Sequence, residues 1–393
     1  MRVRLPSRFD TGQRLHEAAS RQTMDIGMSK QPPKDSSPQS VNRRRWMIAG
    51  VAVLAALFLT VLFWGWRGAP TQTTPVNLTH TYVQALNQAH EGKPGAARVL
   101  YQQLARADLS DAHRIDLLAE LSNYPSPQAL KLLDACLNHE SVTVRQAAIA
   151  TSVKLVPASQ RSLLLGPMLD DKDQSVRFTA TRALLGLSPD DVGLYFAVLQ
   201  QSAEAFQESL KSQAATVDNQ LQLAKLYLQT GDLEPALAAL QRATMLDPEN
   251  IEAALAHIEL LDKKGQAEQA RSLFAGLLER HPDAPLLQHA LGMWLVNHGQ
   301  GEFALLSLAK ALELEPQNTA YRYDLAVALH DLDQLEAAQK QLVQIVQNDP
   351  ANRQARVLLI QYWKENGQLQ NVQILLAELE QQNPDDPALQ QGL

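Results

Sequence analysis

The sequence predicts an all-α protein in which paired helices stack into an α-solenoid behind a single N-terminal transmembrane helix. Pro248, Pro282, Pro316, Pro350 and Pro384 each lie 34 residues from the next, and a fixed period of about 20–50 residues is typical of stacked repeats. Aromatic residues make up only 5% of the chain, and no run of alternating β-branched residues indicates a strand. The uncharged apolar run 46–66 predicts the membrane helix.

The prolines divide residues 217–386 into five units. Proline cannot continue a helix and disfavours helical angles in the preceding residue, and Asn or Asp after it can cap the next helix. A second break recurs within each unit, at a position suited to the left-handed conformation that favours glycine. The residues at this second break are Gly231, Gly265, Gly299, Asp333 and Gly367. Each unit is therefore predicted to be two helices joined by a tight turn.

Residues of fixed size recur between these breaks and predict how the helices pack. Small residues let paired helices approach, and large apolar ones fill the space between repeats. The small positions early in the second helix are Ala236, Ala270, Ala304, Ala338 and Val372. The large positions four residues later are Leu240, Phe274, Leu308, Leu342 and Leu376. The first helices repeat Leu223, Leu291, Leu325 and Leu359, and His257 takes that place in the second unit.

The period and the hairpin units together resemble the tetratricopeptide repeat (TPR) family, whose unit is a 34-residue helix–turn–helix. The family's aromatic near the end of the first helix is kept as Tyr227 and Trp363, but the other three units carry Leu there. Its first-helix glycine is kept as Gly292 alone. The resemblance implies a TPR superhelix over 217–386, with the tail 387–393 as its C-terminal cap.

The N-terminal residues predict a tail and a membrane anchor. Residues 1–45 are polar and rich in Pro and Ser, which predicts a disordered cytoplasmic tail; translation could begin at Met1, Met24 or Met28. Residues 46–66 would span roughly 31 Å as a helix, which matches the hydrocarbon core of a bilayer. A buried soluble helix is the competing interpretation, and the absence of any polar break in the segment disfavours it.

The basic residues around this segment predict its orientation. Arg43, Arg44 and Arg45 precede it, whereas only Arg67 follows closely, so the positive-inside rule places the N-terminus in the cytoplasm. A cleaved signal peptide would have a shorter apolar region and a small-residue cleavage site. We therefore expect a single-pass protein of a bacterial inner membrane, with a linker at 67–78 and a periplasmic repeat domain.

Residues 79–190 predict further helical repeats of two kinds. A helix pair broken at Gly92 and Gly95 partly matches a TPR unit. The Val144-Arg145 and Val176-Arg177 pairs lie 32 residues apart, each after an acidic turn, and this pattern resembles the HEAT repeat. Each Arg is expected to bind nearby carboxylates or turn carbonyls and so join adjacent units, and the acidic residues of this segment (Asp134, Asp170, Asp173) are interpreted as structural. Residues 191–216 are predicted to form one long bridging helix.

HEAT-like units followed by a long helix and TPR units resemble the repeat half of bacterial multihaem cytochrome c-like TPR proteins. The stretch 320–330 adds to this resemblance. The haem-bearing half is missing here, so the resemblance does not imply electron transfer.

The sequence carries no motif of an enzyme. It has no P-loop, no G-x-G-x-x-G, no G-x-S-x-G and no H-E-x-x-H. Cys136 is the single cysteine and lies in an apolar helical pattern, so a buried small hydrophobe is expected. We predict no catalytic residues, no metal site and no cofactor. The net charge of −7 disfavours nucleic acid as a partner.

A repeat array of this kind offers a concave surface lined by the first helix of each unit. By helical phase, the predicted partner-binding residues are Lys225, Leu228, Leu255, Glu259, His289, Met293, Tyr323, Val327, His330, Val357 and Gln361. The mixture of apolar and polar groups favours a helical or extended protein segment with apolar anchors, although some of these positions could serve packing alone.

Three functions compete on this evidence. The first is a membrane-anchored interaction scaffold that displays its solenoid in the periplasm. The second is a chaperone or assembly factor that binds client peptides, as in cytochrome c maturation. The third, a redox protein or enzyme, is disfavoured by the missing haem motif. The sequence names neither the partner nor the oligomeric state.

Overall fold

The computed structural model describes residues 81–390. The chain divides into two units, Met1–Leu78 and Thr79–Leu393, and the described residues belong to the second. The predicted tail 1–45, membrane helix 46–66 and linker 67–78 lie outside them. Within residues 81–390, no helix is both long and apolar enough to cross a membrane.

The first part of the described chain is a series of short helices that end at residue 212. They are α2 (Tyr82–His90), α3 (Ala96–Leu104), α4 (Asp111–Leu121), α5 (Pro127–Leu137), α6 (Val142–Leu155), α7 (Ala158–Leu165), α8 (Gln174–Leu184), α9 (Pro189–Val192) and α10 (Phe196–Ser212), with 3-10 turns at Gly166–Asp170 and Gly193–Tyr195. The break predicted between α2 and α3 is present, because Gly92 and Gly95 both have positive φ.

Five helical hairpins follow, as the proline period predicts. They are α11 (Val217–Thr230) with α12 (Leu233–Leu246), α13 (Ile251–Lys263) with α14 (Ala267–Arg280), α15 (Pro285–Asn297) with α16 (Gly301–Leu314), α17 (Thr319–Asp331) with α18 (Leu335–Asn348), and α19 (Arg353–Glu365) with α20 (Leu369–Gln382); the short α21 (Pro387–Gln390) ends the described chain. Asn250, Asn318 and Asn352 cap α13, α17 and α19 through their side chains.

The turn inside each hairpin confirms the prediction of a left-handed residue. Gly231, Gly265, Gly299 and Gly367 have φ between 67° and 85°, and Asp333 takes the same conformation with φ 58°. The first helix of each hairpin therefore ends where the sequence predicts. The fourth hairpin accepts a residue other than glycine at this position.

The repeated small and large residues form the cores between the helices. Ala236, Ala270, Ala304 and Ala338 are completely buried. The residues four positions later are buried in the first four units, and Leu376 is partly buried. Gly292 lies so close to α16 that an added Cβ would lie 2.6 Å from Leu308 Cγ, so this glycine sets the approach of the paired helices.

The N-terminal helices contain the inter-repeat arginine that the sequence predicts. The Arg145 guanidinium donates to the carbonyls of His139 and Glu140, both at 2.9 Å, and binds Asp171 at 2.8–2.9 Å. Both side chains of the Arg145–Asp171 pair are almost fully buried. Arg177 donates to the Asp171 carbonyl at 2.8 Å. The resemblance of this segment to HEAT repeats stays a prediction.

The predicted bridging helix is shorter than 191–216. Gly193 has φ 56° and ψ −124°, so it ends α9 and separates it from α10. Gln213 is extended, with φ −87° and ψ 165°, and it ends α10 at Ser212. The predicted helix includes Gly193, and the conformation of this residue accounts for the later start of α10.

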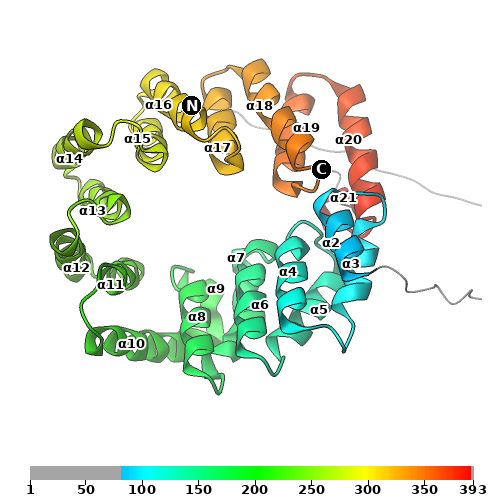
Figure 1. The fold of residues 1–393 in the computed structure, drawn as a ribbon, viewed down its shortest axis with the longest axis horizontal. Coiled ribbons are helices and arrows are strands. Elements are labelled where there is room, and N and C mark those ends of the chain that lie inside the picture. The colour runs from blue at the N-terminus through cyan, green and yellow to red at the C-terminus, as the bar shows by residue number, and fades with distance from the viewer. Residues whose placement is uncertain (1–80, 391–393) are drawn as a thin grey trace, which may run out of the picture. The chain divides into compact units, whose positions relative to one another are not determined.

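The second unit closes on itself, because its first helices contact its last ones (Figure 1). The Gly95 amide donates to the Gln381 carbonyl at 2.7 Å, and Asn383 Nδ2 donates to the Pro125 carbonyl at 2.7 Å. Ala351 is buried in the same hydrophobic cluster as α2 to α10. We call this junction, between α2–α5 and α19–α21, the seam.

Candidate functional site

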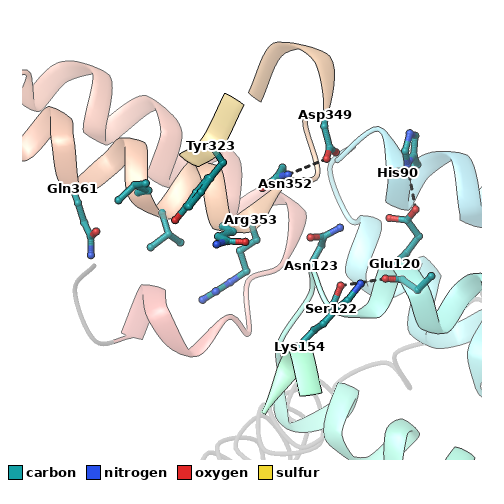
Figure 2. A pocket seen from close by; sticks show the side chains of 14 residues that line it. His90, Glu120, Ser122, Asn123, Lys154, Tyr323, Asp349, Asn352, Arg353 and Gln361 are labelled. Carbon is teal, nitrogen blue, oxygen red and sulfur yellow. Dashed lines mark hydrogen bonds and ion pairs between the residues drawn. The ribbon is translucent and has the colours of Figure 1, made fainter. Parts of the chain in front are cut away.

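A pocket of ≈ 710 Å³ lies at the seam, and we call it the seam pocket (Figure 2). Residues from both ends of the described chain line it: His90, Ala119, Glu120, Ser122, Asn123, Lys154, Tyr323, Asp349, Asn352, Arg353, Gln354, Val357, Leu358 and Gln361. The first six come from α2, α4 and α6 or the residues after α4, and the others come from α17, α19 and the turn before α19.

The C-terminal wall is held in place by the proline turn that precedes α19. Asn352 accepts from the Ala355 amide at 2.9 Å and donates to Asp349 at 3.1 Å. Arg353, which begins α19, binds both carboxylate oxygens of Asp386 at 2.6 and 2.9 Å. The Asp386 side chain is almost fully buried, so this pair fixes the first turn of the helix that carries Val357 and Gln361.

Arg356 also stabilises the proline turn that precedes α19. It is 3% exposed, donates to the Pro350 carbonyl at 2.6 Å and binds Glu378 of α20 at 3.0 Å. Burial lowers the pKa of Arg356, and the Glu378 carboxylate opposes that shift. This arginine therefore ties α19 to α20 and to the proline turn at once.

The N-terminal wall carries polar groups from the ends of α2, α4 and α6. His90 Nδ1 lies 3.2 Å from Glu120 Oε1, which joins the end of α2 to the end of α4. Ser122 Oγ donates to the Ala119 carbonyl at 3.1 Å. Lys154, in the last turn of α6, is exposed, and no ion pair is found for it among the described residues.

The pocket therefore offers several kinds of contact. Lys154 brings a positive charge, whereas the charge of Arg353 is compensated by Asp386. Glu120 and Asp349 bring negative charge. Four side-chain amides, of Asn123, Asn352, Gln354 and Gln361, can each donate and accept hydrogen bonds. Val357, Leu358 and the Tyr323 ring add apolar surface. Within residues 81–390, no three His, Cys, Asp or Glu side chains gather as a metal site.

The structure brings three of the predicted partner-binding residues together in this pocket, namely Tyr323, Val357 and Gln361. Lys225 lines a smaller pocket of ≈ 170 Å³ beside Arg182 and Phe206. Leu228, Leu255 and Met293 pack partly against the hydrophobic cores. Glu259 is exposed and Val327 partly buried, and neither lines the seam pocket.

His289 and His330 instead link neighbouring repeats. His289 Nε2 lies 2.7 Å from Asp324, and the ring stacks on Tyr321 at 4.5 Å. His330 Nε2 lies 2.7 Å from Glu365, and its ring stacks on Tyr362 at 4.0 Å. In both cases the acid lies 35 residues after the histidine. These histidines are thus engaged with the following unit.

No sequence pattern predicts the N-terminal half of the pocket. His90, Glu120, Asn123 and Lys154 follow no 34-residue period, and they meet α19 only because the seam closes. Cys136 is buried as predicted, and burial raises the pKa of its thiol.

Comparisons with known proteins identify the repeats. Family models described as "Tetratricopeptide repeat" match residues 217–250 and 236–293. A relative from Sinorhizobium fredii (strain NBRC 101917 / NGR234), "Uncharacterized protein y4yS", is 27% identical over 135 residues, which cover 33% of this chain and 74% of that protein.

Solved structures resemble the chain at low identity. YrrB, "a TPR protein with an unusual peptide-binding site", is 23% identical, covers 48% of this chain and 98% of its own, and gives a TM-score of 0.34. Yeast Tom70 is 15% identical, covers 84% of this chain and 66% of its own, and gives 0.44. MamA is 14% identical over 42% of this chain and 91% of its own, with a TM-score of 0.35. The chain therefore contains tetratricopeptide repeats, matched over residues 217–293, and residues 81–390 form an all-α solenoid.

Proposed function

We propose that this protein is an interaction scaffold that holds an extended segment of a partner protein in the seam pocket. The observation that carries the proposal is the pocket itself, whose ≈ 710 Å³ are lined from two sides by a mixture of charges, amides and apolar groups. TPR arrays generally bind proteins or peptides, and no catalytic constellation competes for this pocket among its lining residues.

The chemistry of the lining favours an extended peptide. Side-chain amides can pair with both the N–H and the C=O groups of a peptide backbone that has no partner of its own. Val357, Leu358 and the Tyr323 ring can receive an apolar side chain of the bound segment. Lys154 would attract an acidic residue or a chain-terminal carboxylate of that segment.

The place of action is part of the proposal. The charge asymmetry of Arg43, Arg44 and Arg45 against Arg67 supports a cytoplasmic N-terminus and a repeat domain displayed in the periplasm from a membrane anchor at 46–66. The partner would then be an envelope protein. The bilayer itself would be contacted through residues 46–66.

A photoreactive amino acid in place of Gln361 tests the site in intact cells. Gln361 is exposed and lines the pocket, so the full-length protein should form a discrete crosslinked species there. The same photoreactive residue in place of Met245, which is 82% exposed on α12, should not form that species. An identical pattern from both positions would remove the pocket as the binding site.

A charge reversal checks the same site without disturbing a core. Lys154→Glu should weaken the Gln361 crosslink, because the pocket loses a cation that has no ion pair to break. Lys131→Glu on α5, also exposed and outside the pocket, is the matched control. Equal crosslinking in both variants would show that the pocket charge has no part in binding.

A chaperone or assembly factor is the second candidate. The four amides favour it, because contacts to a peptide backbone tolerate many client sequences. The crosslinked partners distinguish the two functions. A scaffold should capture one folded partner at steady state, whereas an assembly factor should capture several newly made proteins that disappear when translation is stopped.

A further inference from the structure

We propose that the seam pocket exists only while the seam is closed, so that partner binding and closure of the helical unit are a single coupled event, with residues 383–386 as the latch. This inference rests on the function proposed above and adds how that function would be regulated. It concerns the contacts that join the first and last helices, which are made by residues outside the pocket lining.

The walls of the pocket belong to opposite ends of the described chain. Glu120 and Lys154 lie on one side, and Arg353 and Gln361 lie on the other (Figure 2). If the seam opened, each wall would keep its own helices, α2, α4 and α6 on one side and α17 and α19 on the other, but the two walls would separate. A ligand that contacts both walls therefore binds the closed form more tightly than the open form, and it must stabilise closure to the same extent.

The latch touches both the seam and the pocket. Asn383 donates to the Pro125 carbonyl on the N-terminal side at 2.7 Å. Three residues later, Asp386 binds Arg353 of the pocket through two hydrogen bonds, at 2.6 and 2.9 Å. Asn383 and Asp386 are 3% and 2% exposed. The turn 383–386 therefore links the position of Arg353 in the pocket to the contact with Pro125 across the seam.

The seam consists largely of polar contacts, unlike the cores within the hairpins. Gln382, Asn383 and Asp386 are buried polar residues there, and Ala351 is the residue that joins the N-terminal hydrophobic cluster from the C-terminal repeats. In a solenoid each hairpin is stabilised by its sequence neighbours. Opening at the seam therefore leaves every hairpin with its own core, and an open form is accessible without unfolding.

Gly92 offers a way to open the seam without touching the pocket. A Cβ at this position would lie 2.8 Å from the Pro350 carbonyl oxygen and 2.8 Å from Gln382 Nε2. The first of these neighbours is backbone, so an alanine would push the two ends apart. Gly95, in the same loop, also has positive φ, but a Cβ there would have no neighbour within 4 Å. Gly95→Ala therefore introduces the same kind of backbone strain as Gly92→Ala but no steric clash across the seam.

Hydrogen exchange reports the seam directly in the full-length protein. The Gly95 amide donates to Gln381 across the seam, so its exchange rate follows opening. Gly92→Ala should speed exchange in the 91–97 segment, whereas α4 and α17 should exchange as in the wild type. Gly95→Ala should leave exchange in the same 91–97 segment close to the wild-type rate, because the amide of residue 95 can still donate to the Gln381 carbonyl. Asn383→Ala, which removes the bond to Pro125, is a second opening variant should Gly92→Ala fail to fold.

The photoreactive residue at position 361 then tests the coupling. If opening lowers the closed fraction to about a tenth, apparent affinity falls about tenfold, and the crosslink should weaken accordingly in Gly92→Ala but not in Gly95→Ala. If hydrogen exchange shows that the seam opens in Gly92→Ala but the crosslink keeps its wild-type strength, the coupling is wrong and the proposed function stands. Absence of the crosslink in the wild type would instead refute the proposed function.

Discussion

His257 is the one residue that departs from the Leu repeated in the first helices. Burial lowers its pKa from the ordinary value of 6.5, because the charged imidazolium is disfavoured away from water. As pH falls below 6.5, His257 therefore binds a proton more readily in the unfolded chain than in the folded chain. The stability contributed by neutral His257 is present above that pH and is lost as pH falls below it.

His257→Leu should remove this penalty and restore the repeat residue. We expect the variant to be more stable at neutral pH by about 1 kcal/mol, from added apolar burial. The gain should grow as pH falls from 6.5 toward 5. Urea unfolding midpoints of the wild type and the variant across this range provide the measurement. A constant difference at all pH values would show that His257 does not titrate against folding.

Asp333 shows that the 34-residue period can predict the backbone conformation of a single residue. Four hairpins place glycine at the inner turn, and the sequence predicts that Asp333 takes the same left-handed conformation, which it does with φ 58°. Short polar side chains tolerate this region better than others. The backbone was thus predictable where the alternative conformations are few. The partners of His289 and His330 were not, because a side chain's contact depends on the stagger between neighbouring units.

At the scale of the helices, spacing and residue size predict the hairpins well. The proline turns, the inner glycines and the buried alanines all recur as expected, because each depends on contacts within one unit or with the next. Gly193 marks a failure of the same reasoning. A single glycine inside a helical pattern does not reveal whether the helix continues through it, and here α9 ends at Val192, just before Gly193.

Two helix glycines should respond in opposite directions to alanine. Gly292→Ala places a Cβ 2.6 Å from Leu308 Cγ and 3.2 Å from the Ala304 carbonyl, so it should destabilise the protein by about 1–3 kcal/mol through overpacking. Gly276 in α14 has no neighbour closer than 3.8 Å, at the flexible end of Arg280. Gly276→Ala should stabilise it by about 0.5–1 kcal/mol through helix propensity.

Thermal and urea unfolding of both glycine variants provide the comparison. Circular dichroism should show the same helical content in the two folded proteins, so that the difference lies in the midpoint. Destabilisation of similar size by both substitutions would mean that Gly292 does not set the separation of α15 and α16.

At the scale of the whole helical unit, the sequence predicts neighbours but not closure. Tyr323, Val357 and Gln361 could be placed on an inner helix face, since helical phase within a repeat determines it. Their meeting with His90, Glu120 and Lys154 depends on the sum of many small rotations between hairpins. No local pattern specifies that sum, so the N-terminal wall of the candidate site was beyond prediction.

Closure should also weaken at high pH, because a buried tyrosine lies at the seam. Tyr101 donates to the Tyr124 carbonyl at 2.6 Å and accepts from Ser126 at 2.9 Å. Burial, with a smaller contribution from the Asp385 and Asp386 charges, raises the pKa of Tyr101 from 10.0 to about 12. The stability tied to the neutral phenol is complete below pH 10 and is lost as pH rises toward 12, by about 2–3 kcal/mol.

Tyr101→Phe should be less stable than the wild type at neutral pH, because it lacks the two hydrogen bonds of the hydroxyl group. Between pH 10 and 12, however, its free energy of unfolding should fall less than that of the wild type. Tyr227→Phe, in α11 and far along the chain from the seam, should follow the wild type. Urea midpoints measured at each pH, with tyrosinate absorbance followed in parallel, give both quantities. Because ionised Tyr101 would lie beside Asp385 and Asp386, its tyrosinate signal should rise together with loss of the seam contacts. A Tyr101→Phe variant that weakens with pH as steeply as the wild type would place the alkaline transition elsewhere in the unit.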